Sequence, residues 1–157
     1  MKRNTMMKTF KEAISNVLVT MFFQPVQFVD SKCTLPEWFS DGQALVGATL
    51  SFSGPLAGSI YLLIPVMVVK DMTANFLGLE QEEIQEEQGG DTVKEAANMI
   101  GGHMLSLLDM KGAFRLGIPE LLRENDLIND RLRDIEGETI FIKTEGSRLA
   151  AGIMIET

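Results

Sequence analysis

A carboxylate, a carboxamide and a glycine recur along one side of a helix predicted for residues 91–108, and they are the residues best suited to chemistry. Successive helical residues step about 100° around the axis, so four positions fall within roughly 60° of one another. These positions are Asp91, Glu95, Asn98 and Gly102. Glu95 and Asn98 are three residues apart, so both reach into one pocket. A carboxylate, which accepts hydrogen bonds, and an amide, which both donates and accepts them, would thus line one exposed groove.

The opposite side of the same helix carries an apolar stripe, which predicts that this side packs against a core. Its members are Val93, Ala96, Ala97, Ile100, Met104, Leu107 and Leu108. The polar side has a simple alternative interpretation as a solvated helix face, where a glutamate and an asparagine three residues apart are common. Gly102 lowers helix propensity by roughly 1 kcal/mol relative to alanine, and it leaves room for another surface to approach.

The first elements of the chain are predicted from its apolar spacing. Apolar residues recur at steps of three and four over residues 10–22, which predicts an amphipathic helix that Pro25 ends. Met21 is among the residues expected to face inward. Residues 26–32 alternate weakly and are expected to form a strand. Residues 34–42 contain a proline and a glycine and are expected to form a loop. Trp38 in this loop is either a core residue or an interface residue.

Two hairpins are predicted from alternating apolar and polar residues. Residues 44–53 alternate and pair with residues 58–64 across a Ser-Gly-Pro turn. Residues 139–144 and 148–155 form the second hairpin around the Glu-Gly-Ser turn at 145–147, with Ile140 expected to face residues such as Ala151 across it. Both hairpins present one apolar face, which must be covered.

The segments between the hairpins are expected to be helices and polar connections. A helix is predicted over residues 65–77, because a proline suits its first position and a glycine follows its end. Phe76 is among its residues expected to point inward. Residues 80–87 hold five glutamates and are expected to form a solvated helix or linker. The glycines at 89–90 should break the chain, so that Asp91 caps the next helix. Residues 119–132 are polar and mixed, with at most one short helical turn expected.

Together these elements predict an α+β fold, a mostly antiparallel sheet with helices packed on one face. Each helix has only one apolar side, so all of them must cover the same apolar surface of the sheet. An exposed sheet edge would also favour pairing with another copy of the chain.

The composition is that of an acidic globular domain. The chain has 157 residues, a net charge of −8 and a pI of about 4.7, which suits one domain over residues 1–157 and argues against a nucleic-acid partner. Cys33 is its only cysteine, so no intrachain disulfide can form and a reducing compartment is expected. The amino terminus has no apolar signal-peptide core, and the longest apolar run, residues 60–69, is too short to span a bilayer. We therefore expect a soluble cytoplasmic protein.

The pattern Asp-x-x-x-Glu-x-x-Asn-Met-Ile-x-Gly at residues 91–102 resembles the active-site signature of the CheC/CheX/FliY chemotaxis phosphatases. It is most similar to the CheX-like branch, which carries a single motif. The order of predicted elements resembles that branch over nearly the whole chain, and Phe-x-Leu-Gly-Ile-Pro at residues 114–119 resembles its segment after the signature helix. One departure is present, because His103 stands where relatives often have a second asparagine. CheC-type members carry two signature helices, whereas here Glu12 and Asn16 are four residues apart, so the first helix carries no second motif.

This resemblance implies hydrolysis of the aspartyl phosphate on a response regulator such as CheY, in chemotaxis or two-component signalling. Asn98 would position the nucleophilic water, and Glu95 would bind the regulator's active-site lysine. Asp91 and Gly102 would contact the partner, although helix capping is the favoured role for Asp91. The chain would need no cofactor of its own, because Mg²⁺ is expected on the regulator. The resemblance also implies a homodimer with one site in each subunit.

The main alternative is a non-catalytic CheX-like module that docks a response regulator as an adaptor or dimerisation domain. Comparing regulator binding with regulator dephosphorylation distinguishes the two. His103, Ser106 and Asp109 supply the residue types of a hydrolytic triad, but they lie on one helix without a nucleophile elbow or oxyanion nest. A metal site is not expected from a single histidine and a single cysteine. The ten methionines are expected to fill the core.

Overall fold

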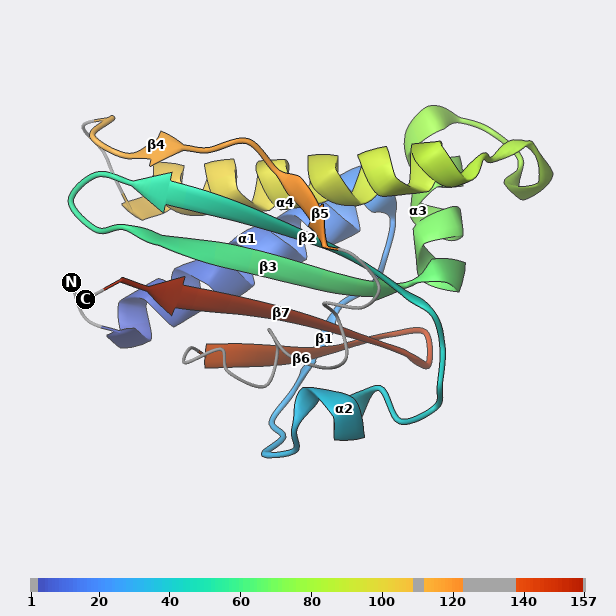
Figure 1. Cartoon of the computed structure of the whole chain (residues 1–157), viewed down its shortest axis with the longest axis horizontal. Helices are drawn as coiled ribbons and strands as arrows, with labels where there is room; N and C mark the ends of the chain where they lie inside the picture. Colours follow the sequence, from blue (N-terminus) through green and yellow to red (C-terminus); the bar gives the residue numbers. More distant parts are fainter. Residues whose placement is uncertain (1–2, 109–111, 123–137, 157) are drawn as a thin grey trace.

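The chain folds into an α+β arrangement of helices on an antiparallel sheet, as the sequence predicts (Figure 1). The computed structural model describes residues 3–108, 112–122 and 138–156. Within this part of the chain every strand pairing is antiparallel. The strands lie in the order β1 (Gln27–Val29), β6 (Glu138–Thr144), β7 (Ser147–Ile155), β3 (Gly58–Pro65), β2 (Leu45–Ser53) and β4 (Arg115–Leu116), and β5 (Glu120–Leu122) also pairs with β2.

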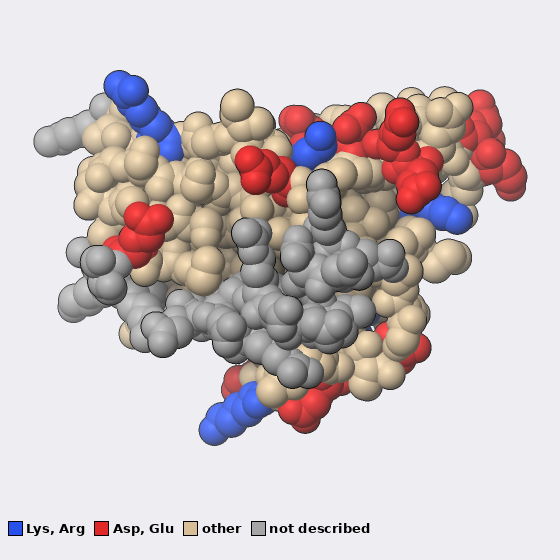
Figure 2. Space-filling model, viewed as in Figure 1, with Lys and Arg blue, Asp and Glu red and all other residues tan. Residues whose placement is uncertain are grey.

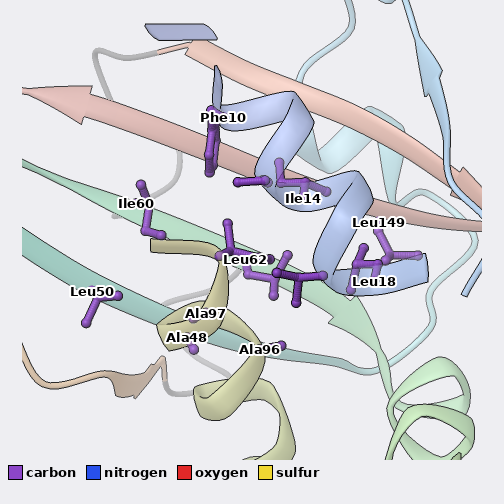
Figure 3. Close-up of a cluster of buried hydrophobic side chains, with 14 of the residues drawn as sticks. Phe10, Ile14, Leu18, Ala48, Leu50, Ile60, Leu62, Ala96, Ala97 and Leu149 are labelled. Atoms are coloured by element: carbon purple, nitrogen blue, oxygen red, sulfur yellow. The ribbon is translucent and has the colours of Figure 1, made fainter. Parts of the chain in front are cut away.

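The long helices of the described chain pack on one face of this sheet, and α1 and α4 lie against each other there (Figure 1). Figure 3 shows the core between the two layers, which Phe10, Ile14 and Leu18 of α1 enter from the helical side. Ala96 and Ala97 of α4 are fully buried in the same core. These helices are α1 (Arg3–Phe22), α3 (Val66–Leu77) and α4 (Glu86–Leu108).

Helix α1 follows the predicted pattern closely. Its predicted core residues are buried except Met21, which is 39% exposed and was wrongly expected to face inward. The helix ends at Phe22, before Pro25, because proline has no N–H and restricts the residue before it. Phe23 then takes a left-handed conformation with φ 55°, which turns the chain away from the helix axis.

Helix α3 also lies close to its predicted position. Pro65 is the last residue of β3 and the N-cap of α3 rather than its first helical residue. Gly78 closes the helix in a left-handed conformation with φ 68°, as expected for a C-terminal glycine. Phe76 was expected to point inward but is 37% exposed, although its ring centroid lies 5.1 Å from that of Phe22.

The helix that carries the candidate residues begins earlier than predicted, at Glu86. Gly89 and Gly90 do not break the chain but lie inside the helix and are buried. A Cβ at Gly89 would lie 3.1 Å from Val69 Cγ1, and one at Gly90 would lie 2.9 Å from Leu121 Cδ1. The glycines therefore allow close packing, and this tertiary contact outweighs their low helix propensity.

A short helix, α2 (Leu35–Trp38), forms where a loop was predicted. It begins with a capping box, in which the Thr34 hydroxyl accepts from the Glu37 N–H and the Glu37 carboxylate accepts from the Thr34 N–H, both at 3.3 Å. Trp38 is a core residue, 4% exposed, and its Nε1 donates to the Leu149 carbonyl at 2.8 Å. This second core lies on the face opposite α4 and also contains Leu35, Tyr61, Leu63, Phe141 and Ala150.

Both predicted hairpins form, and in the second Ile140 faces Ala151 as expected. The helical turn expected within residues 119–132 is not seen over residues 120–122, which form β5, and the rest of that segment lies outside the described residues. Among the described helices, none is both long and apolar enough to cross a membrane.

Candidate functional site

The candidate residues lie on α4, which packs between α1 and an edge strip formed by residues 115–122 (Figure 1). Glycines let the helix sit close to both the sheet and the edge strip. A Cβ at Gly101 would lie 2.7 Å from Leu50 Cδ2 and 3.0 Å from Leu116 Cδ1. Nearer the start of the helix, Gly90 makes a similarly close contact with Leu121. These contacts fix which side of α4 faces outward.

Glu95 and Asn98 lie on the outward side of α4, and each is half-buried. Ala96 and Ala97, which lie between them in the sequence, are fully buried. The polar pair and the alanine pair therefore lie on opposite sides of the helix. In the described chain no hydrogen bond or ion pair engages either polar side chain, and no buried side-chain nitrogen or oxygen lacks a partner. The unpartnered polar atoms of Glu95 and Asn98 therefore reach solvent. Two such groups one helical turn apart can engage a ligand presented from outside.

Asp91 and Gly102 extend this outward side in both directions, and we refer to the four residues as the α4 stripe. Asp91 does not cap the helix as predicted, because α4 begins at Glu86 and runs through it. Its side chain is 75% exposed and lies 3.5 Å from Lys94 Nζ, a surface ion pair that contributes little stability. A Cβ at Gly102 would meet Leu116 Cδ2 at 3.9 Å, an ordinary contact. Gly102 is therefore not required by the packing of its own chain.

The edge strip places an apolar residue beside the stripe that sequence reasoning did not single out. Ile118, between β4 and β5, is 85% exposed, and Leu121 in β5 is 45% exposed. The sequence feature that points to this position is an isoleucine between a glycine and a proline, two residues that are common in turns. Such neighbours favour a break in the ladder between β4 and β5, which is where Ile118 lies.

His103 belongs to the other flank of α4 and contacts α1. Its Nε2 atom lies 3.1 Å from the Asn16 amide nitrogen, which links the two helices. Ser106 is exposed, and Asp109 lies outside the described residues, so no triad is assembled by what the structure describes. Among the described residues there is also no cluster of three or more histidine, cysteine or carboxylate side chains that could hold a metal ion.

Negative charge gathers near the first half of α4. Figure 2 shows carboxylates along the upper edge of the molecule, over the start of α4 and the preceding 3₁₀ turn η1 (Gln81–Glu83). Exposed members of this group are Glu80, Glu82, Glu83, Glu86, Glu87 and Asp91. A partner that docks here must carry complementary positive charge.

A cavity of about 480 Å³ lies away from the α4 stripe, between α1, β1 and the start of β6. Its lining includes Lys11, Asp30 and Glu138 but no residue of α4. Small-molecule sites are usually concave and largely apolar, whereas the stripe is open and polar. The stripe therefore suits a group presented by a larger partner better than a free small molecule.

One family model and several solved structures match the chain. The family model described as chemotaxis phosphatase CheX matches residues 46–142, a range that includes both Glu95 and Asn98. A comparison with curated proteins finds no match. The detailed similarities of this chain are therefore to solved structures.

Three solved structures illustrate that likeness. The chain is similar to the chemotaxis protein CheX from Vibrio vulnificus, with a TM-score of 0.74, 18% identity and 99% of each chain covered. It is similar to CheX from Desulfovibrio desulfuricans, with a TM-score of 0.71, 20% identity and 97% of this chain and 99% of that chain covered. It is also similar to the CheX–CheY–BeF3–Mg²⁺ complex from Borrelia burgdorferi, with a TM-score of 0.69, 17% identity and 96% and 97% covered. At these identities the shared property is the fold.

Proposed function

The chain belongs to the chemotaxis phosphatase CheX family, and from this we propose that it hydrolyses the aspartyl phosphate of a CheY-like response regulator. The observation that carries the proposal is the placement of Glu95 and Asn98, half-buried, one turn apart and unpartnered within the described chain. The solved CheX of Borrelia burgdorferi is bound to CheY, which supports a regulator as the partner here. Membership of the family also supports a role in chemotaxis signalling.

Asn98 holds the attacking water in the proposed mechanism. Its carbonyl oxygen accepts a hydrogen bond from the water, and its amide nitrogen has donors for the water or a phosphoryl oxygen. The water oxygen attacks phosphorus as the bond from phosphorus to the regulator's aspartyl oxygen breaks. The products are an aspartate carboxylate and inorganic phosphate, and the water proton leaves with the phosphate or to solvent. Phosphoryl transfer depends chiefly on positioning and electrostatics, so one well-placed amide is sufficient to accelerate the hydrolysis.

Glu95 binds the lysine of the regulator's active site and so fixes how the two proteins meet. A hydrogen bond between a carboxylate and an ammonium is stronger than a neutral one and restricts orientation. Mg²⁺ carried by the regulator neutralises charge on the phosphoryl group. Asp91 adds negative charge at the border of the contact, and Gly102 leaves space for the partner's surface.

Three wider expectations accompany this proposal. The chain acts as one domain over residues 1–157, works in the cytoplasm where response regulators are phosphorylated, and forms a homodimer with one α4 stripe in each subunit. Light scattering of the purified protein tests the dimer directly, since the mass of 17.4 kDa per chain would double.

The decisive experiment measures phosphate loss from a CheY-like regulator that has been phosphorylated with a small phosphodonor. The wild-type protein should accelerate that loss, and Asn98→Ala should reduce the acceleration about 100-fold, equivalent to roughly 2.7 kcal/mol. Asn4→Ala is the matched control, because Asn4 is an exposed asparagine of α1, outside the α4 stripe. Circular dichroism should show both variants folded.

Two results would count against the proposed function. Equal turnover by the wild type and Asn98→Ala would remove the water-positioning role. Tight binding of the phosphorylated regulator by a wild-type protein that never accelerates phosphate loss would instead identify a non-catalytic adaptor.

A further inference from the structure

Ile118 is the most exposed large apolar residue of the described chain, at 85% exposure. Single exposed apolar residues are common on protein surfaces, so exposure alone says little. What distinguishes Ile118 is its position along α4, the rigidity of the chain that holds it and the charge around it.

The edge strip runs alongside α4 in the opposite direction. Leu116 contacts the helix at Gly101, and Leu121 contacts it at Gly90. The two glycines are separated by about 16 Å of helix, at 1.5 Å per residue. The two leucines are separated by four residues of the paired strand β2, or about 13 Å. The edge strip therefore follows the helix over nearly the whole distance between the contacts.

Ile118 lies level with the proposed catalytic pair. Ile118 is two residues after Leu116, which contacts Gly101, and three before Leu121, which contacts Gly90. Interpolation between these two contacts places Ile118 beside the part of α4 between Glu95 and Asn98. Asn98 also precedes Gly101 by three residues, so it belongs to the side of the helix nearest the edge strip. An apolar side chain therefore stands beside the two polar ones on the same open surface.

The corner that carries Ile118 is rigid. The Gly117 N–H donates to the Ser51 carbonyl at 2.7 Å, and a Cβ at Gly117 would lie 3.0 Å from the same oxygen. Residues 117–119 face only two residues of β2, the pattern of a β-bulge, which pushes a side chain out of the ladder. Pro119 restricts the backbone further. The orientation of Ile118 is thus set before any partner arrives, which lowers the entropy lost on binding.

The charge around Ile118 indicates what covers it. Three carboxylates, those of Asp91, Glu95 and Glu120, lie on the helix and on the edge strip. Two cations lie among them, Lys94, which pairs with Asp91, and the exposed Arg115, so the surface keeps a net negative charge. A second copy of the chain placed on this surface would bring like charges together. The phosphorylation face of a response regulator, with its lysine and Mg²⁺, has the complementary charge.

We propose that Ile118 is the apolar anchor of the regulator-docking surface, covered by an apolar patch next to the regulator's phosphorylation site. This inference rests on the proposed function and deepens it. Glu95 fixes the regulator on one side of the reacting group and Ile118 fixes it on the other, so that the water on Asn98 meets the phosphorus in line. Ile118 is a positioning residue, because it touches the partner and not the reacting atoms.

The test measures binding and turnover separately in Ile118→Ser. Binding is measured by titration with a CheY-like regulator activated by beryllofluoride and Mg²⁺, and turnover by phosphate loss at several regulator concentrations. We expect Ile118→Ser to weaken binding and raise KM at least 10-fold while kcat stays within about two-fold, and Ile118→Leu to retain binding. Met67→Ser is the matched control, because Met67 is 65% exposed on α3, away from the α4 stripe.

The outcomes separate this inference from the proposed function. Unchanged binding by Ile118→Ser would overturn the anchor even if Asn98→Ala had lost its activity as expected. Conversely, binding that depends on Ile118 in a protein without turnover would support the anchor while the phosphatase proposal failed. A loss of binding by Met67→Ser equal to that of Ile118→Ser would also overturn the anchor, because the effect would not be local.

Discussion

Gly101 of α4 lies so close to Leu116 of β4 that a Cβ at the glycine would stand 3.0 Å from the Leu116 Cδ1 atom. The same Cβ would stand 2.7 Å from Leu50 Cδ2, in a side chain that is only 1% exposed. At the neighbouring Gly102 the nearest atom is 3.9 Å away. Of these two adjacent glycines, only Gly101 is therefore required by packing within the chain.

We predict that Gly101→Val destabilises the protein by about 2 kcal/mol, because the buried leucines cannot move aside without strain. Gly102→Ala should leave stability unchanged or raise it by up to about 1 kcal/mol, because alanine has the higher helix propensity and meets no clash. Urea unfolding followed by circular dichroism measures both changes. Equal losses in the two variants would contradict the contact geometry, since only one of the positions is crowded.

The parts of the structure that sequence reasoning predicted are those set by local geometry. Glu95 and Asn98 share the outward side of α4 because residues three apart always neighbour each other on a helix. The second hairpin is equally local, since Glu145 and Gly146 both have positive φ, of 46° and 86°, in a two-residue turn. The long helices and the two hairpins could therefore be predicted without knowing their neighbours.

The errors arise where distant parts of the chain decide. Gly89 and Gly90 were read as a break because glycine disfavours helices, yet contacts with Val69 and Leu121 hold them inside α4. Those partners lie about 20 and 30 residues away in sequence, so their approach is a tertiary property. The position of Ile118 beside the α4 stripe depends in the same way on the register between the edge strip and β2.

The start of α2 is a different kind of error, because its signal was local. Thr34 and Glu37 have the spacing of a capping box, and a proline suits the first turn of a helix. The proline and glycine of this region, considered alone, predict a loop instead. With the helix formed, Trp38 is directed into the second core, a role the sequence had left undecided.

A second prediction concerns Glu95 and separates its role from that of Asn98. If Glu95 binds the regulator's lysine, Glu95→Gln should weaken regulator binding about 10-fold, since a hydrogen bond to a charged group contributes roughly 1.5–3 kcal/mol. The variant should also lose part of the salt dependence of binding, because an ion pair is screened by added salt. Titration with beryllofluoride-activated regulator at low and high ionic strength measures both effects.

Lys94→Gln provides the matched comparison for Glu95→Gln, because it changes the charge by one unit in the opposite direction at the adjacent position of α4. Lys94 is paired with Asp91 in the structure, so its removal should strengthen rather than weaken binding to a basic surface. A Glu95→Gln variant that binds as tightly as the wild type at low salt would show that Glu95 does not meet a cation in the complex.

A third prediction concerns Tyr61, the chain's only tyrosine, on the face of the sheet away from α4. Its ring stacks directly on Gly152, where a Cβ would overlap it, and its hydroxyl lies 2.8 Å from the Thr139 hydroxyl. Burial raises the pKa of Tyr61, and the hydrogen bond with Thr139 opposes part of that rise. The folded protein therefore releases this proton at a higher pH than the unfolded chain does.

The sign of the resulting pH dependence follows from proton binding. Below the unfolded pKa of about 10, Tyr61 is protonated in both states and its stabilising contribution is complete. As the pH rises above that value the unfolded chain loses the proton first, so unfolding is favoured and the contribution is lost through the folded pKa. We expect the free energy of unfolding to fall above about pH 10, and to fall less steeply in Tyr61→Phe.

Tyr61→Phe keeps the ring that packs on Gly152 and removes only the hydroxyl, so at neutral pH it should cost about 1 kcal/mol for the lost hydrogen bond with Thr139. Denaturant unfolding of both proteins at several alkaline pH values measures the two slopes. The tyrosinate absorbance gives an independent check, because a single tyrosine produces the whole signal. Ionisation of the folded protein at or below the ordinary tyrosine pKa would contradict the burial of this hydroxyl. Parallel slopes in Tyr61→Phe and the wild type would show that other groups dominate alkaline unfolding.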